Sequence, residues 1–139
     1  FQGGTLFRSF AKGQVPGAMP RALAIRTADP RGEEFPVFRA FWIERPGADS
    51  VATIHAVADS ETATAAFRFT LRANDITILD TEATIFARAP IETVGLAPMQ
   101  ASFLFGGNRR RSVDDYRPSV YEANGLQMLN GQGEWIWRP

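Results

Sequence analysis

The sequence contains no cysteine and only one histidine, His55, among its 139 residues. The absence of cysteine excludes disulfides, thiolate catalysis and cysteine-based zinc sites, and a single histidine cannot form a histidine-rich metal centre. His55 lies in the apolar run VATIHAVA. No carboxylate stands at ligand spacing along this run, so we expect a packed or solvent-edge histidine rather than a metal ligand.

An excess of charge of one sign is also missing, because 15 lysines and arginines balance 15 aspartates and glutamates. Nucleic acid and anionic membranes both require a concentrated basic face, so the sequence argues against either as the main partner. No stretch approaches eighteen uninterrupted apolar residues, the approximate length of a membrane-spanning helix. We therefore expect no membrane-spanning segment.

The two ends of the chain carry few boundary signals. The sequence has no initiator methionine and no basic segment followed by an apolar one, as a secretory leader would have. Its last residues, GEWIWRP, resemble a strand without a terminating turn. We expect an internal piece of a longer protein.

Short apolar runs, separated by 12 glycines and nine prolines, dominate the sequence. The clearest is AFRFTLR, in which Phe67, Phe69 and Leu71 alternate with polar residues, as in a half-buried strand. Other runs rich in β-branched and aromatic residues are RALAIRTA (21–28), FPVFRAFWIE (35–44), VATIHAVA (51–58), DITILDTEATIFA (75–87), ASFLFG (101–106) and EWIWR (134–138). The pattern predicts an all-β, mostly antiparallel sandwich or barrel.

Several connecting segments allow two interpretations. RAND (72–75) suits a hairpin turn, because asparagine tolerates positive φ. SETATAAFRF (60–69) could instead begin a helix. GGNRRR (106–111) is typical of a solvated hairpin tip more than of a phosphate-binding loop, and DPRGEEF (29–35) is a turn whose two carboxylates could simply be solvated.

The segment SVDDYRPSVYEANGLQM (112–128) concentrates polar and aromatic residues between two predicted strands. It contains Asp114, Asp115, Tyr116, Arg117, Tyr121, Glu122 and Asn124. Turn chemistry alone would explain this composition. Sugar recognition would also explain it, since rings stack on pyranoses while carboxylates, amides and guanidinium groups bind hydroxyls. Trp42, Trp135 and Trp137 add aromatic surface, although tryptophans two apart on a strand often serve packing.

Four long motifs, ALAIRTADPRGEEFPVFRAFWIERP, GLAPMQASFLFGGN, VDDYRP and GLQMLNGQGEWIWRP, resemble the osmoregulated periplasmic glucan biosynthesis proteins, G and D members. The resemblance implies that residues 1–139 are the central part of an N-terminal β-sandwich domain of the galactose-mutarotase-like supersandwich type. The immunoglobulin-like domain that follows in complete members is not included.

The same resemblance implies a periplasmic location, reached through a cleaved signal peptide. It implies action on the β-1,2-glucan backbone without metal or organic cofactor, and contact with the inner-membrane glucan synthase. Some members are similar to inverting endo-β-1,2-glucanases, which use one carboxyl group as acid and another as base.

This chain departs from the family pattern at the presumed acid. After YRP the family reads Val-His-Asp-Ser-Asp-Gly-Leu, whereas this chain reads Val-Tyr-Glu-Ala-Asn-Gly-Leu over 120–126. Glu122 keeps a carboxylate that is one methylene longer, and the amide of Asn124 cannot donate the proton.

From the resemblance we expect three catalytic candidates and five substrate-binding ones. If the chain is active, Glu122 is the acid, Glu34 (in preference to Glu33) is the water-activating base, and Asp115 is in reserve. The substrate-binding set is Tyr116, Arg117, Tyr121, Asn124 and Glu33. The alternatives are a non-catalytic glucan-binding or scaffolding protein with a degenerate loop, and a structural β domain without sugar affinity.

Overall fold

The computed structural model describes residues 5–10, 12–13, 15, 17–47, 51–73, 76–107 and 114–139. In these residues it contains strands and turns but no helix, and the pairs β2–β7, β3–β4, β4–β5, β5–β6, β9–β10 and β11–β12 are all antiparallel. The predicted all-β, antiparallel class is therefore confirmed. Within the described ranges, nothing helical has the length and apolar character that crossing a membrane requires. The chain divides into two compact units, Phe1–Val15 with Met19–Met99, and Pro16–Ala18 with Gln100–Pro139.

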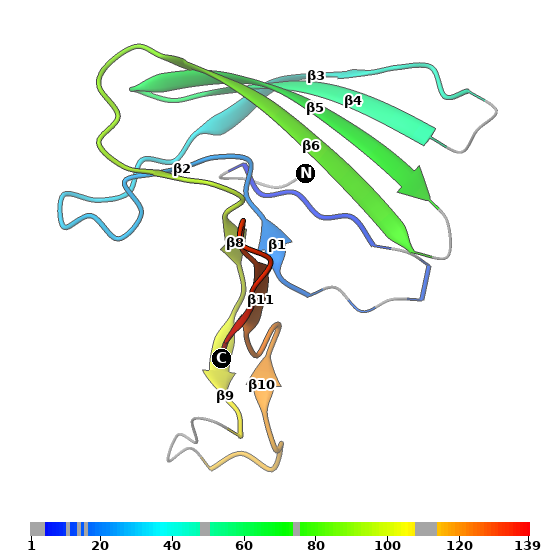
Figure 1. Ribbon diagram of the computed structural model, residues 1–139, viewed down its shortest axis with the longest axis vertical. Coiled ribbons are helices and arrows are strands. Elements are labelled where there is room, and N and C mark those ends of the chain that lie inside the picture. Colours follow the sequence, from blue (N-terminus) through cyan, green and yellow to red (C-terminus); the bar gives the residue numbers. More distant parts are fainter. Residues whose placement is uncertain are drawn as a thin grey trace. The chain divides into compact units, whose positions relative to one another are not determined.

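A four-stranded antiparallel sheet dominates the first unit, with its strands in chain order (Figure 1). The strands are β3 (Val37–Ile43), β4 (Val51–Asp59), β5 (Ala63–Ala73) and β6 (Thr77–Ala87). β5 and β6 are antiparallel neighbours on either side of the turn predicted at 72–75, whose residues 74 and 75 lie outside the described part. The alternative helix over 60–69 is wrong, because β5 already begins at Ala63.

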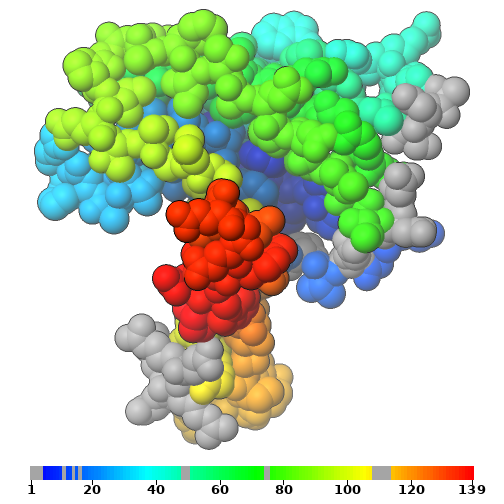
Figure 2. All heavy atoms as spheres, viewed as in Figure 1, coloured from blue at the N-terminus to red at the C-terminus, as the bar shows by residue number. Residues whose placement is uncertain are grey.

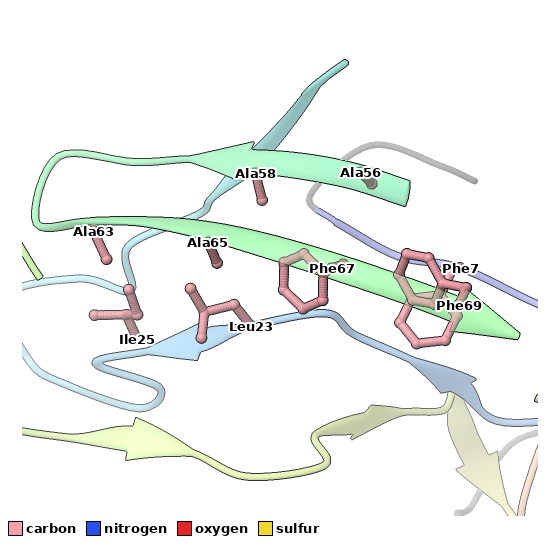
Figure 3. Packing of buried hydrophobic residues seen from close by; sticks show 9 residues of the cluster. All are labelled: Phe7, Leu23, Ile25, Ala56, Ala58, Ala63, Ala65, Phe67 and Phe69. Atoms are coloured by element: carbon pink, nitrogen blue, oxygen red, sulfur yellow. The ribbon is translucent and has the colours of Figure 1, made fainter. Parts of the chain in front are cut away.

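Strict alternation along β5 builds the core of the first unit. Ala63, Ala65, Phe67 and Phe69 are buried, while Arg68 between them is exposed. This apolar face, together with Ala56 and Ala58 of β4, packs against Phe7, Leu23 and Ile25 (Figure 3). Burying each large apolar side chain contributes about 1.5–3 kcal/mol, so the phenylalanines are major contributors to stability.

Short strand pairs complete the first unit. β2 (Ala24–Ile25) pairs with β7 (Val94–Gly95), and β1 (Met19–Pro20) pairs with β8 (Met99–Gln100). The prediction of one long strand over 21–28 is wrong, because only Ala24–Ile25 of this range forms a strand. Arg26 and Ala28 adopt φ values of 54° and 60°. A β ladder requires negative φ, so the strand ends at Ile25.

The second unit contains two small antiparallel pairs. β9 (Phe103–Phe105) pairs with β10 (Val120–Tyr121), and β11 (Leu126–Leu129) pairs with β12 (Trp135–Arg138). Asn130 shapes the tight β11–β12 turn, because its side-chain oxygen accepts hydrogen bonds from the backbone N–H groups of Gln132 and Glu134. The strands predicted at 101–106 and 134–138 are thus present but shorter.

Candidate functional site

The second unit carries six of the eight predicted site residues. Asp115, Tyr116 and Arg117 lie in the connection between β9 and β10, Tyr121 is on β10, and Glu122 and Asn124 lie between β10 and β11. Glu33 and Glu34 belong to the first unit. Residues 112 and 113 of the predicted loop, and 108–111 of GGNRRR, fall outside the described residues.

Asp115 and Arg117 form a clamp around the residue between them. Oδ1 of Asp115 accepts the backbone N–H of Arg117 at 3.0 Å, and the guanidinium group donates to both carboxylate oxygens, with Nη2 2.5 Å from Oδ2. Tyr116, which the clamp brackets, is 97% exposed. The clamp therefore fixes the backbone on both sides of a tyrosine whose ring is directed to solvent.

The clamp also sets the ionisation of its carboxyl group. The side-chain hydrogen bonds from Arg117, with its backbone N–H and charge, lower the pKa of Asp115 to about 2. The same pair raises the pKa of Arg117. Asp115 is therefore ionised at neutral pH and can accept hydrogen bonds, but it holds no proton to donate.

Tyr121 belongs to an aromatic pair on the β9–β10 ladder. Its ring stacks on that of Phe103, with centroids 6.0 Å apart and planes 15° from parallel. Gly106 lies against both rings: a Cβ there would be 3.3 Å from an atom of each. This glycine lets the chain pass the aromatic pair closely, and the pair holds Tyr121 half-exposed at the start of the altered loop.

Glu122 continues the ladder beyond β10 through both its backbone and its side chain. Its N–H donates to the carbonyl of Ser102 at 2.8 Å, and Oε2 accepts the N–H of Ser102, also at 2.8 Å. The residue is nevertheless exposed. One carboxylate oxygen of the predicted acid thus satisfies a backbone donor of the opposite segment, a partner that sequence reasoning missed.

Asn124 is exposed and precedes a glycine that lies beneath a tryptophan ring. A Cβ at Gly125 would lie 2.5 Å from Cη2 of Trp137 and 2.7 Å from the carbonyl oxygen of Arg138. Only glycine permits this approach, so the altered loop and β12 are in direct contact. The spacing in sequence gives no sign of this contact, which depends on the β11–β12 register.

Trp135 and Trp137 lie on one face of the β11–β12 hairpin. Their cross-strand neighbours are Leu129 and Gln127, respectively, on the same face. The two tryptophans are 64% and 50% exposed. This face therefore offers two large rings beside a side-chain amide.

Glu34 is buried in the first unit, which corrects the interpretation of its turn as simply solvated. Its carboxylate accepts the backbone N–H of Thr62 at 2.9 Å and the hydroxyl of Thr62 at 2.9 and 3.0 Å to its two oxygens. Nη2 of Arg26 lies 3.6 Å away. Burial alone would raise the pKa of Glu34, but hydrogen bonds from Ser60 and Thr62 and the charge of Arg26 outweigh it and lower the pKa.

Glu33 forms an ion pair with Arg21, at 2.5 Å between Oε1 and Nη2, and the guanidinium group lies over the ring of Phe35. Asp29 and Arg31, in the same turn, repeat the Asp115–Arg117 clamp: the side chain and backbone N–H of Arg31 bind Asp29 and lower its pKa to about 2. The turn is thus a network of ion pairs.

His55 lies half-exposed on β4, with Nε2 2.6 Å from Oε1 of Glu44. Of the two predicted alternatives, a packed or a solvent-edge histidine, the structure shows the second. The carboxylate partner was missed because it is brought close only by the pairing of β3 with β4. Among the described residues, no three acidic or histidine side chains converge as a metal site would require.

Comparison with known proteins places the chain in a family. The model of the family "Periplasmic glucan biosynthesis protein, MdoG" matches residues 1–139. Glucans biosynthesis protein G 1 of Shewanella oneidensis and glucans biosynthesis protein G of Shewanella sp. strain W3-18-1 are each 50% identical over the whole chain, and that of Vibrio cholerae is 48% identical. The chain spans 26% of the length of these relatives. It belongs to the MdoG family of periplasmic glucan biosynthesis proteins.

Proposed function

We propose that the protein containing this chain acts in the periplasm in the biosynthesis or processing of glucan, and that the loop around Glu122 contacts a linear β-1,2-glucan. Family membership together with the ring-bearing surface of the second unit supports this proposal. Tyr116 is held outward by the clamp, and Trp135 and Trp137 are exposed on one face. Flat rings of this kind stack on sugar rings, while nearby amides and guanidinium groups bind hydroxyls.

The first chemical version of the proposal is hydrolysis with inversion. Glu122 would protonate the leaving oxygen, and Glu34, in preference to Glu33, would activate water; Asp115 is the reserve carboxylate. An inverting pair must stand roughly 6.5–9.5 Å apart so that water fits against the sugar. Arg117, Tyr121 and Asn124 would position the glucan, and an inner-membrane glucan synthase would be the partner that supplies it.

The second version is binding or scaffolding without cleavage, and one observation favours it. Oε2 of Glu122 accepts the N–H of Ser102, so this oxygen has a structural role. Asn124 carries an amide, which cannot act as a proton donor of the strength required. In this version the loop keeps its rings and amides for binding, whereas its carboxylates stabilise the local fold.

An assay with the full-length protein separates the two versions. Linear β-1,2-glucan of defined length is incubated with the protein, its chain length is measured before and after, and binding is followed by tryptophan fluorescence. Hydrolysis predicts that Glu122→Gln abolishes cleavage but keeps binding, whereas Glu61→Gln, at an exposed glutamate in the β4–β5 turn, leaves both unchanged.

Binding without cleavage by the unmodified protein would support the second version. Absence of both would refute the whole proposal. A Glu122→Asp, Asn124→Asp double variant then tests the loop itself, because it restores the two acidic groups of the family pattern. Cleavage gained only in this variant would show that the loop substitutions removed the acid from an otherwise intact site.

A further inference from the structure

Glu34 is a buried carboxylate whose two oxygens both contact one residue, Thr62. The backbone N–H of Thr62 donates to Oε1 at 2.9 Å, and the hydroxyl oxygen of Thr62 lies 3.0 Å from Oε1 and 2.9 Å from Oε2. The two residues are 28 positions apart in the sequence. The fold, rather than the local chain, therefore supplies the donors that a buried carboxylate requires.

The β4–β5 turn that carries Thr62 is held in place by hydrogen bonds of its own. The backbone N–H of Ser60 donates to the carbonyl of Ala63 at 2.9 Å. Arg88, which follows β6, donates its backbone N–H to the carbonyl of Thr62 at 2.8 Å and its Nη1 to the carbonyl of Ser60 at 2.6 Å. Thr62 is thus fixed by contacts that do not involve Glu34.

The turn that carries the carboxylate is anchored to the segment after β6. The backbone N–H of Arg26 donates to the carbonyl of Thr93 at 3.1 Å, and Nη2 of Arg31 lies 2.6 Å from Oε2 of Glu92. In Figure 2 the atoms of this turn (sky blue) lie beside those of the segment after β6 (yellow-green). Arg26 and Ala28 adopt positive φ, a strained conformation that is concentrated at functional sites in proteins.

The two oxygens of Glu34 differ in how fully their hydrogen-bonding capacity is used. Thr62 has one hydroxyl hydrogen, so its hydroxyl can donate fully to only one oxygen at a time. Oε1 also accepts the backbone N–H, whereas Oε2 lies 3.6 Å from Nη2 of Arg26, beyond hydrogen-bonding distance. The side chain of Arg26 is 29% exposed, so Oε2 lies beside a group that reaches solvent. Burial disfavours the ionised carboxylate, and the charge of Arg26 favours it.

We propose that Thr62 is the positioning residue of Glu34: its hydroxyl and backbone N–H fix the orientation of the carboxylate, so that Oε1 is occupied and Oε2 remains able to accept a proton. This inference rests on the proposed hydrolysis, in which Glu34 activates water. Thr62 acts only through the orientation and ionisation of Glu34 and does not itself contact the glucan. Misplacement of a reacting group by about 1 Å can cost roughly a hundredfold in rate.

A matched pair of variants in the full-length protein tests this role. Thr62→Val keeps the size, the β-branch and the backbone N–H but removes the hydroxyl, whereas Thr62→Ser keeps the hydroxyl. Thr84→Val, at an exposed threonine of β6, is the control. The titration of Glu34 is followed by NMR with carboxyl-labelled glutamate, and its signal is identified by its loss in Glu34→Gln.

Loss of the hydroxyl should raise the pKa of Glu34, because a hydrogen bond to the ionised form is removed while Arg26 is unchanged. The rise should be about one to two pH units, the equivalent of one hydrogen bond to a charged group. Thr62→Ser and Thr84→Val should titrate as the unmodified protein does. An unchanged pKa in Thr62→Val would overturn the proposal, and so would an equal rise in Thr62→Ser, because the hydroxyl would then not be the cause.

The pH dependence of cleavage separates this inference from the proposed function. If Glu34 is the base, the acid limb of kcat/KM should move to higher pH in Thr62→Val, and kcat above that limb should fall by up to about a hundredfold with little change in KM. A rise in the pKa without movement of the acid limb would support Thr62 as the positioning residue and refute Glu34 as the base. Because the titration is read without glucan, it decides the role of Thr62 even in a protein that does not cleave.

Discussion

Substitution of Gly125 by alanine tests whether the loop that carries Glu122 is held by β12. An added Cβ would lie 2.5 Å from Cη2 of Trp137 and 2.7 Å from the carbonyl oxygen of Arg138. The ring could rotate away, but the carbonyl belongs to the β11–β12 ladder and cannot move without disturbing it. Forcing extra atoms into such a contact typically costs about 1–3 kcal/mol.

Hydrogen exchange in the full-length protein measures this local cost directly. A loss of about 1–3 kcal/mol should speed amide exchange in β11 and β12 by roughly five- to 150-fold where exchange occurs through local opening. Amides of β5, in the other unit, should not change. The intrinsic emission of the tryptophans should shift as well, because the Trp137 ring must leave its position over the glycine.

Gly131→Ala is the matched control in the same hairpin. A Cβ at that position meets nothing within 4 Å, and the residue does not adopt positive φ. Replacing such a glycine usually stabilises a protein slightly, by about 0.4–1 kcal/mol. Equal exchange rates in the two variants would refute the reasoning that Trp137 and the Arg138 carbonyl constrain the loop.

Three further outcomes follow from the described contacts. Phe69→Ala should destabilise the protein by about 3–5 kcal/mol in chemical denaturation, whereas Leu96→Ala, at an exposed position, should have little effect. Because the pKa of Glu34 is lowered in the fold, its stabilisation should be complete above its ordinary pKa and lost as pH falls through the folded value; Glu34→Ala should flatten this acid limb of the stability profile. The Asp115 carboxyl should titrate near pH 2 by NMR, and Arg117→Ala should return its midpoint toward about 3.9; an unchanged midpoint would contradict the clamp.

Strands in which apolar and polar residues alternate strictly could be predicted from sequence, because the alternation separates the face that packs on the core from the face exposed to solvent. AFRFTLR is the clearest case, since its phenylalanines are buried and its arginines exposed. RALAIRTA has similar composition, but Arg26 and Ala28 take positive φ. Single-residue backbone conformations of this kind leave no mark on hydrophobic periodicity, and the predicted strand was therefore too long.

Contacts between distant segments could not be predicted, because they depend on strand register. Glu44 reaches His55 only through the pairing of β3 with β4, and Ser102 reaches Glu122 only through that of β9 with β10. Composition identified the polar loop as a candidate site. It could not indicate which carboxylate oxygens accept hydrogen bonds from other parts of the fold.

The contacts of the four predicted carboxylates limit the chemical roles that each can play toward a ligand. Glu33 pairs with Arg21, Glu34 binds Thr62, Asp115 is clamped by Arg117, and Glu122 accepts the N–H of Ser102. Proton donation to a glycosidic oxygen requires a carboxyl group that keeps its proton near neutral pH. The lowered pKa of Asp115 opposes that requirement, whereas the lowered pKa of Glu34 keeps this predicted base ionised.

Glycan recognition sets a weaker requirement, because stacking needs only exposed rings in fixed positions. Tyr116 meets it, since the Asp115–Arg117 clamp constrains the backbone on either side of it. Trp137 meets it through its contact with Gly125. The clamp that removes Asp115 from acid chemistry is thus also the one that positions Tyr116. The proposed binding without cleavage therefore needs only this ordered surface, and neither Glu122 nor Asn124 has to donate a proton for it.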